Sequence, residues 1–259
     1  MGAPFGQVIG IPSMLNGFLG DVTRVGGGDP FIKSRQSNAN NAANISVGDA
    51  VVLMPDATNG TVKQFADWIA NGGGFSLSTN TASNTTLTPS STNGLSVGML
   101  VKGTGIPAGA YITAVGATTV TISKAATATA NGVTVYYALF YGIAVREVKT
   151  NQPFSAYSPT SPGQTMNYAP GEMVDVLLRG GVLVQNLSGV TAMAGWPAYI
   201  RTILNAGTYP NDVVGGISPV NDGVNSILLD PNLAQAFFTG GYADANNLIE
   251  MCFLSRVQA

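Results

Sequence analysis

The chain has 259 residues, of which 9% are charged, with 33 glycines, 14 prolines and no histidine. A formal net charge of -2 and the lack of any Lys/Arg run give it no electrostatic means of holding phosphate backbones, which argues against a nucleic-acid partner. Few Lys and Glu beside much Gly, Thr and Val disfavour long surface helices. The composition therefore predicts an all-β protein that is rich in loops.

Residues 1–45 are predicted to form an extended N-terminal arm, because proline and glycine interrupt every apolar run in this segment. It has neither a basic leader nor a continuous apolar span, so no signal peptide and no membrane segment is predicted. Its apolar side chains are too numerous for a disordered tail, and we expect them to be buried against other polypeptides or against the protein's own sheet. The candidate anchors are Phe5, Ile11, Leu15, Phe18 and Leu19.

A host β domain is predicted from residues 46–70 and 139–259. Residues 46–54 have the composition of a strand. The apolar spacing from Val62 to Ile69 then predicts one or two helical turns, which end before the three glycines of residues 72–74.

Residues 71–138 are predicted to be a small β module inserted into the host. Between Trp68 and Arg146 the only charged residues are Lys102 and Lys124. The Gly/Ser/Thr/Asn-rich residues 71–93 are expected to be a linker or an exposed loop. Alternating residues on both sides of Gly116-Ala117 predict a hairpin.

The remaining host strands are predicted from turn chemistry and short apolar runs. Residues 173–179 and 182–187 flank Gly180-Gly181, which predicts a hairpin with a two-residue turn. Residues 207–223 are rich in Gly, Pro, Asn and Asp and are expected to be a surface loop. Further strands are predicted at residues 199–204, 227–229 and 248–256. Short strands separated by turns favour a β-sandwich or a barrel-like host domain.

No constellation of catalytic or metal-binding residues is visible. Without histidine the chain lacks Ser-His and Cys-His nucleophile pairs, imidazole ligands and the usual proton carrier near neutral pH. Cys252 is the single cysteine and is expected to be a buried, inert thiol. The glycine triplets fit no nucleotide-binding motif. We therefore expect a protein that is not an enzyme and has no cofactor and no metal.

Several segments resemble the structural cement proteins of tailed-phage capsids. The resemblance rests on VGDAVVLM (residues 47–54), YGIAVREVKT (141–150) and NYAPGEMVDVLLRGGVLVQ (167–185), and more weakly on FTGGYADANNLIEMCFL (238–254). In the module, GMLVKGTGIPAGAYITAV (98–115) is similar to a small β module of phage tail and head proteins.

The resemblance implies a β-rich virion protein that is made in the host cytoplasm and docks on the outer capsid surface. Its partners would be the major capsid protein and further copies of itself, as a homotrimer or alternatively a dimer, with no membrane involved. A tail-fibre or other receptor-binding virion component is the first alternative. A hydrolase that uses carboxylates on a β scaffold is the second.

Overall fold

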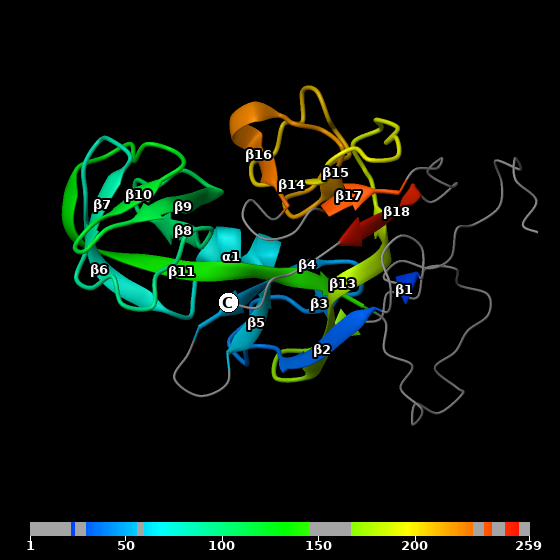
Figure 1. Cartoon of the computed structure of the whole chain (residues 1–259), viewed down its shortest axis with the longest axis horizontal. Helices are drawn as coiled ribbons and strands as arrows, with labels where there is room; N and C mark the ends of the chain where they lie inside the picture. Colours follow the sequence, from blue (N-terminus) through cyan, green and yellow to red (C-terminus); the bar gives the residue numbers. More distant parts are fainter. Residues whose placement is uncertain are drawn as a thin grey trace, which may run out of the picture.

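The computed structural model describes residues 22–23, 30–55, 60–145, 167–229, 236–239 and 247–253. Most regular structure in these residues is β-strand, which confirms the all-β prediction. Thirteen strands belong to one continuous sheet. The described helices are α1 (Phe65–Asn71) and the short 3-10 helix η2 (Gly223–Asn225). Neither is long and apolar enough to span a bilayer. The chain forms a barrel, a host sheet and a smaller lobe (Figure 1).

The barrel occupies one end of the molecule (Figure 1). Its strands are β6 (Ser76–Thr81), β7 (Thr86–Pro89), β8 (Leu100–Gly103), β9 (Ala110–Val115), β10 (Val120–Ile122) and β11 (Ala130–Ala144). They follow the order β11-β6-β7-β10-β9-β8, and pairing of β8 with β11 closes the ring. The predicted hairpin around Gly116-Ala117 is confirmed, with Val120 opposite Val115.

The expectation of a linker or loop at residues 71–93 is wrong. β6 and β7 form a hairpin of the barrel wall, with Thr81 opposite Leu87. Thr79, Thr81 and Leu87 point into the barrel and are buried, while most of the serine, threonine and asparagine side chains between them face solvent. The two-residue period of a strand is present, but small polar residues occupy both faces and conceal it.

β11 is shared by the barrel and the host. Its residues Val135–Ala138 pair with β8, and its residues from Leu139 to Ile143 pair with β4 (Ala50–Met54). The boundary predicted at residue 138 therefore falls inside one strand. In Figure 1 this long strand runs from the barrel into the host sheet.

The host sheet is built around β13. Its strands are β1 (Val22–Thr23), β2 (Phe31–Gln36), β4, β5 (Thr61–Gln64), β13 (Met173–Gln185), β17 (Ala236–Phe238) and β18 (Leu248–Phe253), with β3 (Ile45–Ser46) and β12 (Asn167–Tyr168) paired beside it. β13 pairs with β2 and β11 in its first half and with β1 and β18 in its second half. β1 and β2 lie within the segment expected to be an arm, so the described part of that segment, residues 22–23 and 30–45, contributes two strands to the host sheet.

The predicted hairpin at Gly180-Gly181 is wrong, because β13 is one strand through both glycines. Gly180 and Gly181 stay in the ladder, opposite Phe253 and Cys252 of β18. Gly180 has a φ of 117°, and a Cβ there would lie 3.1 Å from the Cα of Pro30. The pair thus lets β13 bend and pass close to Pro30, where its partners change from β2 and β11 to β1 and β18.

Two local predictions near the start of the host hold in outline. Residues 46–54 contain β4, but a turn at residues 47–49 separates it from β3. The predicted helical turns are α1, which ends at Gly72 with a φ of 67° and a backbone bond from its N–H to the Trp68 carbonyl. A left-handed residue of this kind commonly ends a helix.

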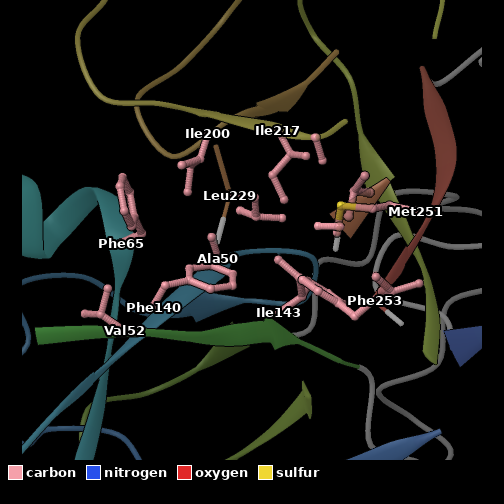
Figure 2. Close-up of a cluster of buried hydrophobic side chains, with 14 of the residues drawn as sticks. Ala50, Val52, Phe65, Phe140, Ile143, Ile200, Ile217, Leu229, Met251 and Phe253 are labelled. Atoms are coloured by element: carbon pink, nitrogen blue, oxygen red, sulfur yellow. The ribbon is translucent and has the colours of Figure 1, made fainter. Parts of the chain in front are cut away.

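The lobe comprises residues 192–229 and contains β14 (Tyr199–Arg201), β15 (Ile217–Ser218) and β16 (Ser226–Leu228) in the order β15-β14-β16. Figure 2 shows Ile200, Ile217 and Leu229 of the lobe facing Phe140 and Ile143 of the host across one apolar cluster. The expectation of an irregular surface loop at residues 207–223 is therefore wrong in part. Within that segment β15 is buried, since Ile217 supplies apolar burial to the shared core.

The glycine at position 142 allows a close approach between β11 and β13. A Cβ at this position would overlap the carbonyl oxygen of Leu177 and lie 2.8 Å from a methyl group of Val176. We expect Gly142→Ala to lower the free energy of unfolding by about 1–3 kcal/mol or more, because a backbone carbonyl has no space to move into. Chemical denaturation measures this loss.

Gly207→Ala is the matched control, because nothing lies within 4 Å of a Cβ at that position and its φ is ordinary. Its stability should stay within about 0.5 kcal/mol of the parent or rise slightly. Equal stability of the two variants would contradict the close approach.

Asp49 ends the turn between β3 and β4. Its Oδ2 accepts hydrogen bonds from the Ser46 N–H and from Nε2 of Gln64, each 2.7 Å long. Burial raises the pKa of Asp49 to about 6, even though both hydrogen bonds act in the opposite direction. The folded state therefore binds a proton here at a pH where the unfolded chain, with an ordinary pKa of 3.8, has lost it.

Asp49 should make the protein more stable as the pH falls from about 7 to about 4, because a raised folded pKa favours the protonated, folded state. Asp49→Asn removes this titration. The variant should show a flatter pH dependence in that range and be more stable at pH 7 by about 1–3 kcal/mol. Urea denaturation at a series of pH values measures both, and identical slopes for parent and variant would rule the effect out.

Candidate interaction surface

The anchors predicted from sequence, Phe5, Ile11, Leu15, Phe18 and Leu19, lie outside the described residues. Their burial against another polypeptide stays a prediction. The nearest described part of the segment is β1, which pairs with Val182 and Gly181 of β13. The N-terminal segment is thus attached to the host sheet immediately after the predicted anchors.

Exposed large apolar side chains concentrate in the lobe. Of the twelve in the described residues, seven belong to it: Met193, Trp196, Ile203, Leu204, Val213, Val224 and Leu228. We call these seven the lobe apolar residues. Single exposed apolar residues are ordinary on a protein surface, but a concentration of them in one small body is typical of contact surfaces. The lobe is therefore a candidate interaction surface.

A buried arginine holds the lobe loops in place. Arg201 is 1% exposed, and its Nε donates to Oδ2 of Asp212 at 2.8 Å, with Nη2 at the same distance from that oxygen. Its Nη1 donates to Asp222, and its guanidinium lies 5.0 Å from the ring centroid of Tyr209. One cation thus connects β14 to three positions in the following loops. These contacts fix the backbone that presents the lobe apolar residues.

Side-chain amides complete this network around Asp222. Asn205 and Asn225 each donate to the Asp222 carboxylate, at 3.0 and 3.2 Å. Burial acts to raise the pKa of Asp222, but the hydrogen bonds from Asn205, Asn225 and Arg201, with the Arg201 charge, together hold it below its usual value. The carboxylate is therefore charged at neutral pH and is a permanent partner of Arg201.

The lobe is also fixed against the barrel. Lys124 of the barrel donates from Nζ to the carbonyl of Ala108 and to that of Val224 in the lobe, each at 2.7 Å. Burial lowers the pKa of Lys124. A Cβ at Gly109 would overlap the side chain of Thr202, so the two bodies touch directly there. A cavity of about 370 Å³ lies beside this junction and is lined by residues of both bodies, among them Tyr111, Tyr199 and Leu228.

The sequence predicted strands where the lobe has β14 and β16, but the Arg201 network was missed, although one observation pointed to it. In a chain with few charges, Arg201, Asp212 and Asp222 fall close together in a segment otherwise rich in Gly, Pro and Asn. Charged residues that persist in such a segment are candidates for a buried network. Their spacing fits no catalytic or metal-binding motif.

Titratable side chains elsewhere have structural roles. The carboxylate of Glu172 accepts the Ala169 N–H at 2.7 Å, and Asp175 accepts the hydroxyl of Ser34, so the closest acid pair in the sequence serves two separate contacts. Cys252 is fully buried, as predicted, and burial raises its pKa. No group of three or more His, Cys, Asp or Glu side chains in the described residues is arranged to hold a metal ion.

Arg201→Leu should destabilise the lobe, because it leaves the buried Asp212 carboxylate without its counter-charge. We expect a loss of about 3–5 kcal/mol, which is typical when one partner of a buried ion pair is removed. Arg201→Leu combined with Asp212→Leu should recover part of this loss, because no unpaired carboxylate then remains at the pair. Chemical denaturation measures both variants, and equal losses would assign the effect to lost packing instead.

Comparison with known proteins gives one match. Residues 96–253 match the family model described as structural cement protein (E217 gp24/Pam3 gp6). No curated protein and no solved structure matches the chain. The matched range contains part of the barrel, all of β11 and β13 and the whole lobe. Because it covers more than half of the chain, the protein belongs to the structural cement protein family of phages.

Proposed function

We propose that the protein binds the outer surface of a phage capsid and stabilises the lattice of the major capsid protein. Membership of the structural cement family is the observation that supports this, because it makes the protein a structural component of the virion. The same observation favours the capsid over a tail-fibre or receptor-binding role. Membership of a family of structural proteins also supports a function without catalysis.

The N-terminal arm would make the first contact with the shell. Phe5, Ile11, Leu15, Phe18 and Leu19 would lie across neighbouring capsid subunits, and each fully buried side chain would contribute about 1.5–3 kcal/mol. Since a lattice presents the same site many times, linked copies would gain further from avidity. Several such anchors offset the entropy lost when an extended segment becomes ordered.

The lobe apolar residues would form a second contact. The Arg201 network holds their backbone in place before binding, so little conformational entropy is lost when the surface is covered. Self-association as a homotrimer, or alternatively as a dimer, would place several arms and lobes on one local symmetry axis of the shell. The barrel would then project away from the capsid and contact neighbouring copies or ligands in the environment.

Binding to purified, DNA-free shells tests this proposal. The parent protein should co-sediment with shells and not with isolated tails. Deletion of residues 2–20 removes the anchors but ends before β1, so the variant should keep its thermal unfolding midpoint and lose shell binding by about tenfold or more. A full-length variant with serine at all five anchor positions is the control for length and should behave like the deletion. A parent protein that ignores shells, or a deletion that binds equally well, would contradict the proposal.

A further inference from the structure

β2 is exposed on both of its faces. Five of its six residues are exposed and the sixth, Arg35, is half-buried. Phe31 and Ile32 are 42% and 41% exposed, although they point to opposite sides of the strand. Strands of a folded protein usually bury at least one face, and the edge strands β5 and β17 of this sheet do so. β2 is therefore a strand whose apolar residues have little cover within the described part of the chain.

On the edge of β2 that faces away from β13, the strand pairing among the described residues is a single bridge at the strand's end, between Ser37 and Val62 of β5. The rest of that edge, along residues 31–35, has no strand partner among the described residues. Two hydrogen bonds at the C-terminal end of β2 show which way its backbone groups point. The N–H of Ser37 donates to Glu172 on the β13 side, whereas the N–H of Asn38 donates to Val62 on the opposite side. Backbone groups alternate along an antiparallel strand, so those of Ile32, Ser34 and Gln36 point to the edge away from β13.

The chemistry of this edge is apolar and cationic. Phe31, Lys33 and Arg35 share one face, where they lie beside Val174 and Val176 of β13. Arg35 donates from Nε to the Tyr141 hydroxyl at 3.0 Å, which orients its guanidinium on that face. Ile32, Ser34 and Gln36 share the other face, where Asp175 accepts the Ser34 hydroxyl. A strand added here would meet two cations on one face and an apolar residue near one end.

We propose that the outer edge of β2 receives an extended, acidic segment of the capsid subunit, which adds as a further strand to the host sheet. Main-chain hydrogen bonds to Ile32 and Ser34 would supply affinity, and carboxylates opposite Lys33 would supply specificity. This inference rests on the proposed capsid binding and names the surface and the chemistry of the partner.

The charges on β2 also favour this partner over a second copy of the same strand. Lysine on an edge strand discourages unwanted pairing between identical strands. Antiparallel self-pairing centred on Lys33 or on Ser34 would bring cations of the two copies directly opposite each other, which is unfavourable. An acidic strand meets no such repulsion.

Ser34→Pro tests the backbone part of the inference. It removes an N–H that points away from β13 and places the proline ring at the outer edge, where strands tolerate proline. Ser34→Ala is the matched control, because it loses the same bond to Asp175 and keeps the N–H. We expect Ser34→Pro to bind DNA-free shells about tenfold more weakly than Ser34→Ala, with both variants folded by circular dichroism.

Lys33→Glu tests the charge. It should weaken shell binding about tenfold or more, whereas Lys102→Glu on β8 of the barrel should leave binding unchanged. Parent-like binding by both Ser34→Pro and Lys33→Glu, with the 2–20 deletion still defective, would overturn the β2 inference and leave the proposed function standing. Failure of the parent to bind shells would instead remove the proposed function.

Analytical ultracentrifugation tests whether a second copy of this chain, and not a capsid segment, pairs with the β2 edge. The oligomeric state of Ser34→Pro should equal that of the parent. If Ser34→Pro dissociates the oligomer while shell binding is unchanged, β2 pairs with another copy of this chain and the inference of a capsid strand is wrong.

Discussion

The whole arrangement depends on two long strands, β11, which the barrel and the host sheet share, and β13, around which the host sheet is built. β11 closes the barrel with its first part and joins the host sheet with its second. β13 pairs with β2 and β11 in its first half and with β1 and β18 in its second half. The two strands meet at Gly142, where the absence of a side chain lets the Leu177 carbonyl approach. Because this contact is backbone against backbone, it positions the barrel relative to the host sheet without a large interface between separate domains.

The scarcity of charged side chains limits how the protein can contact a partner. Charged side chains are few, and several of the described ones, such as Lys63, Arg201 and Asp212, are buried in internal pairs. Contacts with other molecules must therefore rely mainly on apolar residues and backbone groups, which the lobe and β2 provide, with Lys33 as an exposed charge beside them. Such contacts are short-ranged and depend on shape, so they suit a surface that is repeated identically, as a capsid lattice is.

Part of this could be predicted from the sequence. The all-β class, the hairpin around Gly116-Ala117, the helical turns before Gly72 and the burial of Cys252 follow from local patterns of apolar residues and turn chemistry. The hairpin expected at Gly180-Gly181 failed because the same two glycines serve either a turn or a bend beside Pro30, and only the distant partner decides between them. β6 and β7 were missed because serine and threonine occupy both faces. The Arg201 network joins residues through tertiary contacts that no local pattern reveals.

We propose above all that the capsid covers the arm and the apolar and backbone groups that the described part of the chain leaves exposed. A density map of the intact virion at side-chain resolution tests this most directly. It should show the chain on the outer shell, with residues 1–20 lying across capsid subunits and an extended capsid segment beside β2. A map that places the chain on the tail, or that shows residues 1–20 packed on its own host sheet with β2 facing solvent, would contradict the account.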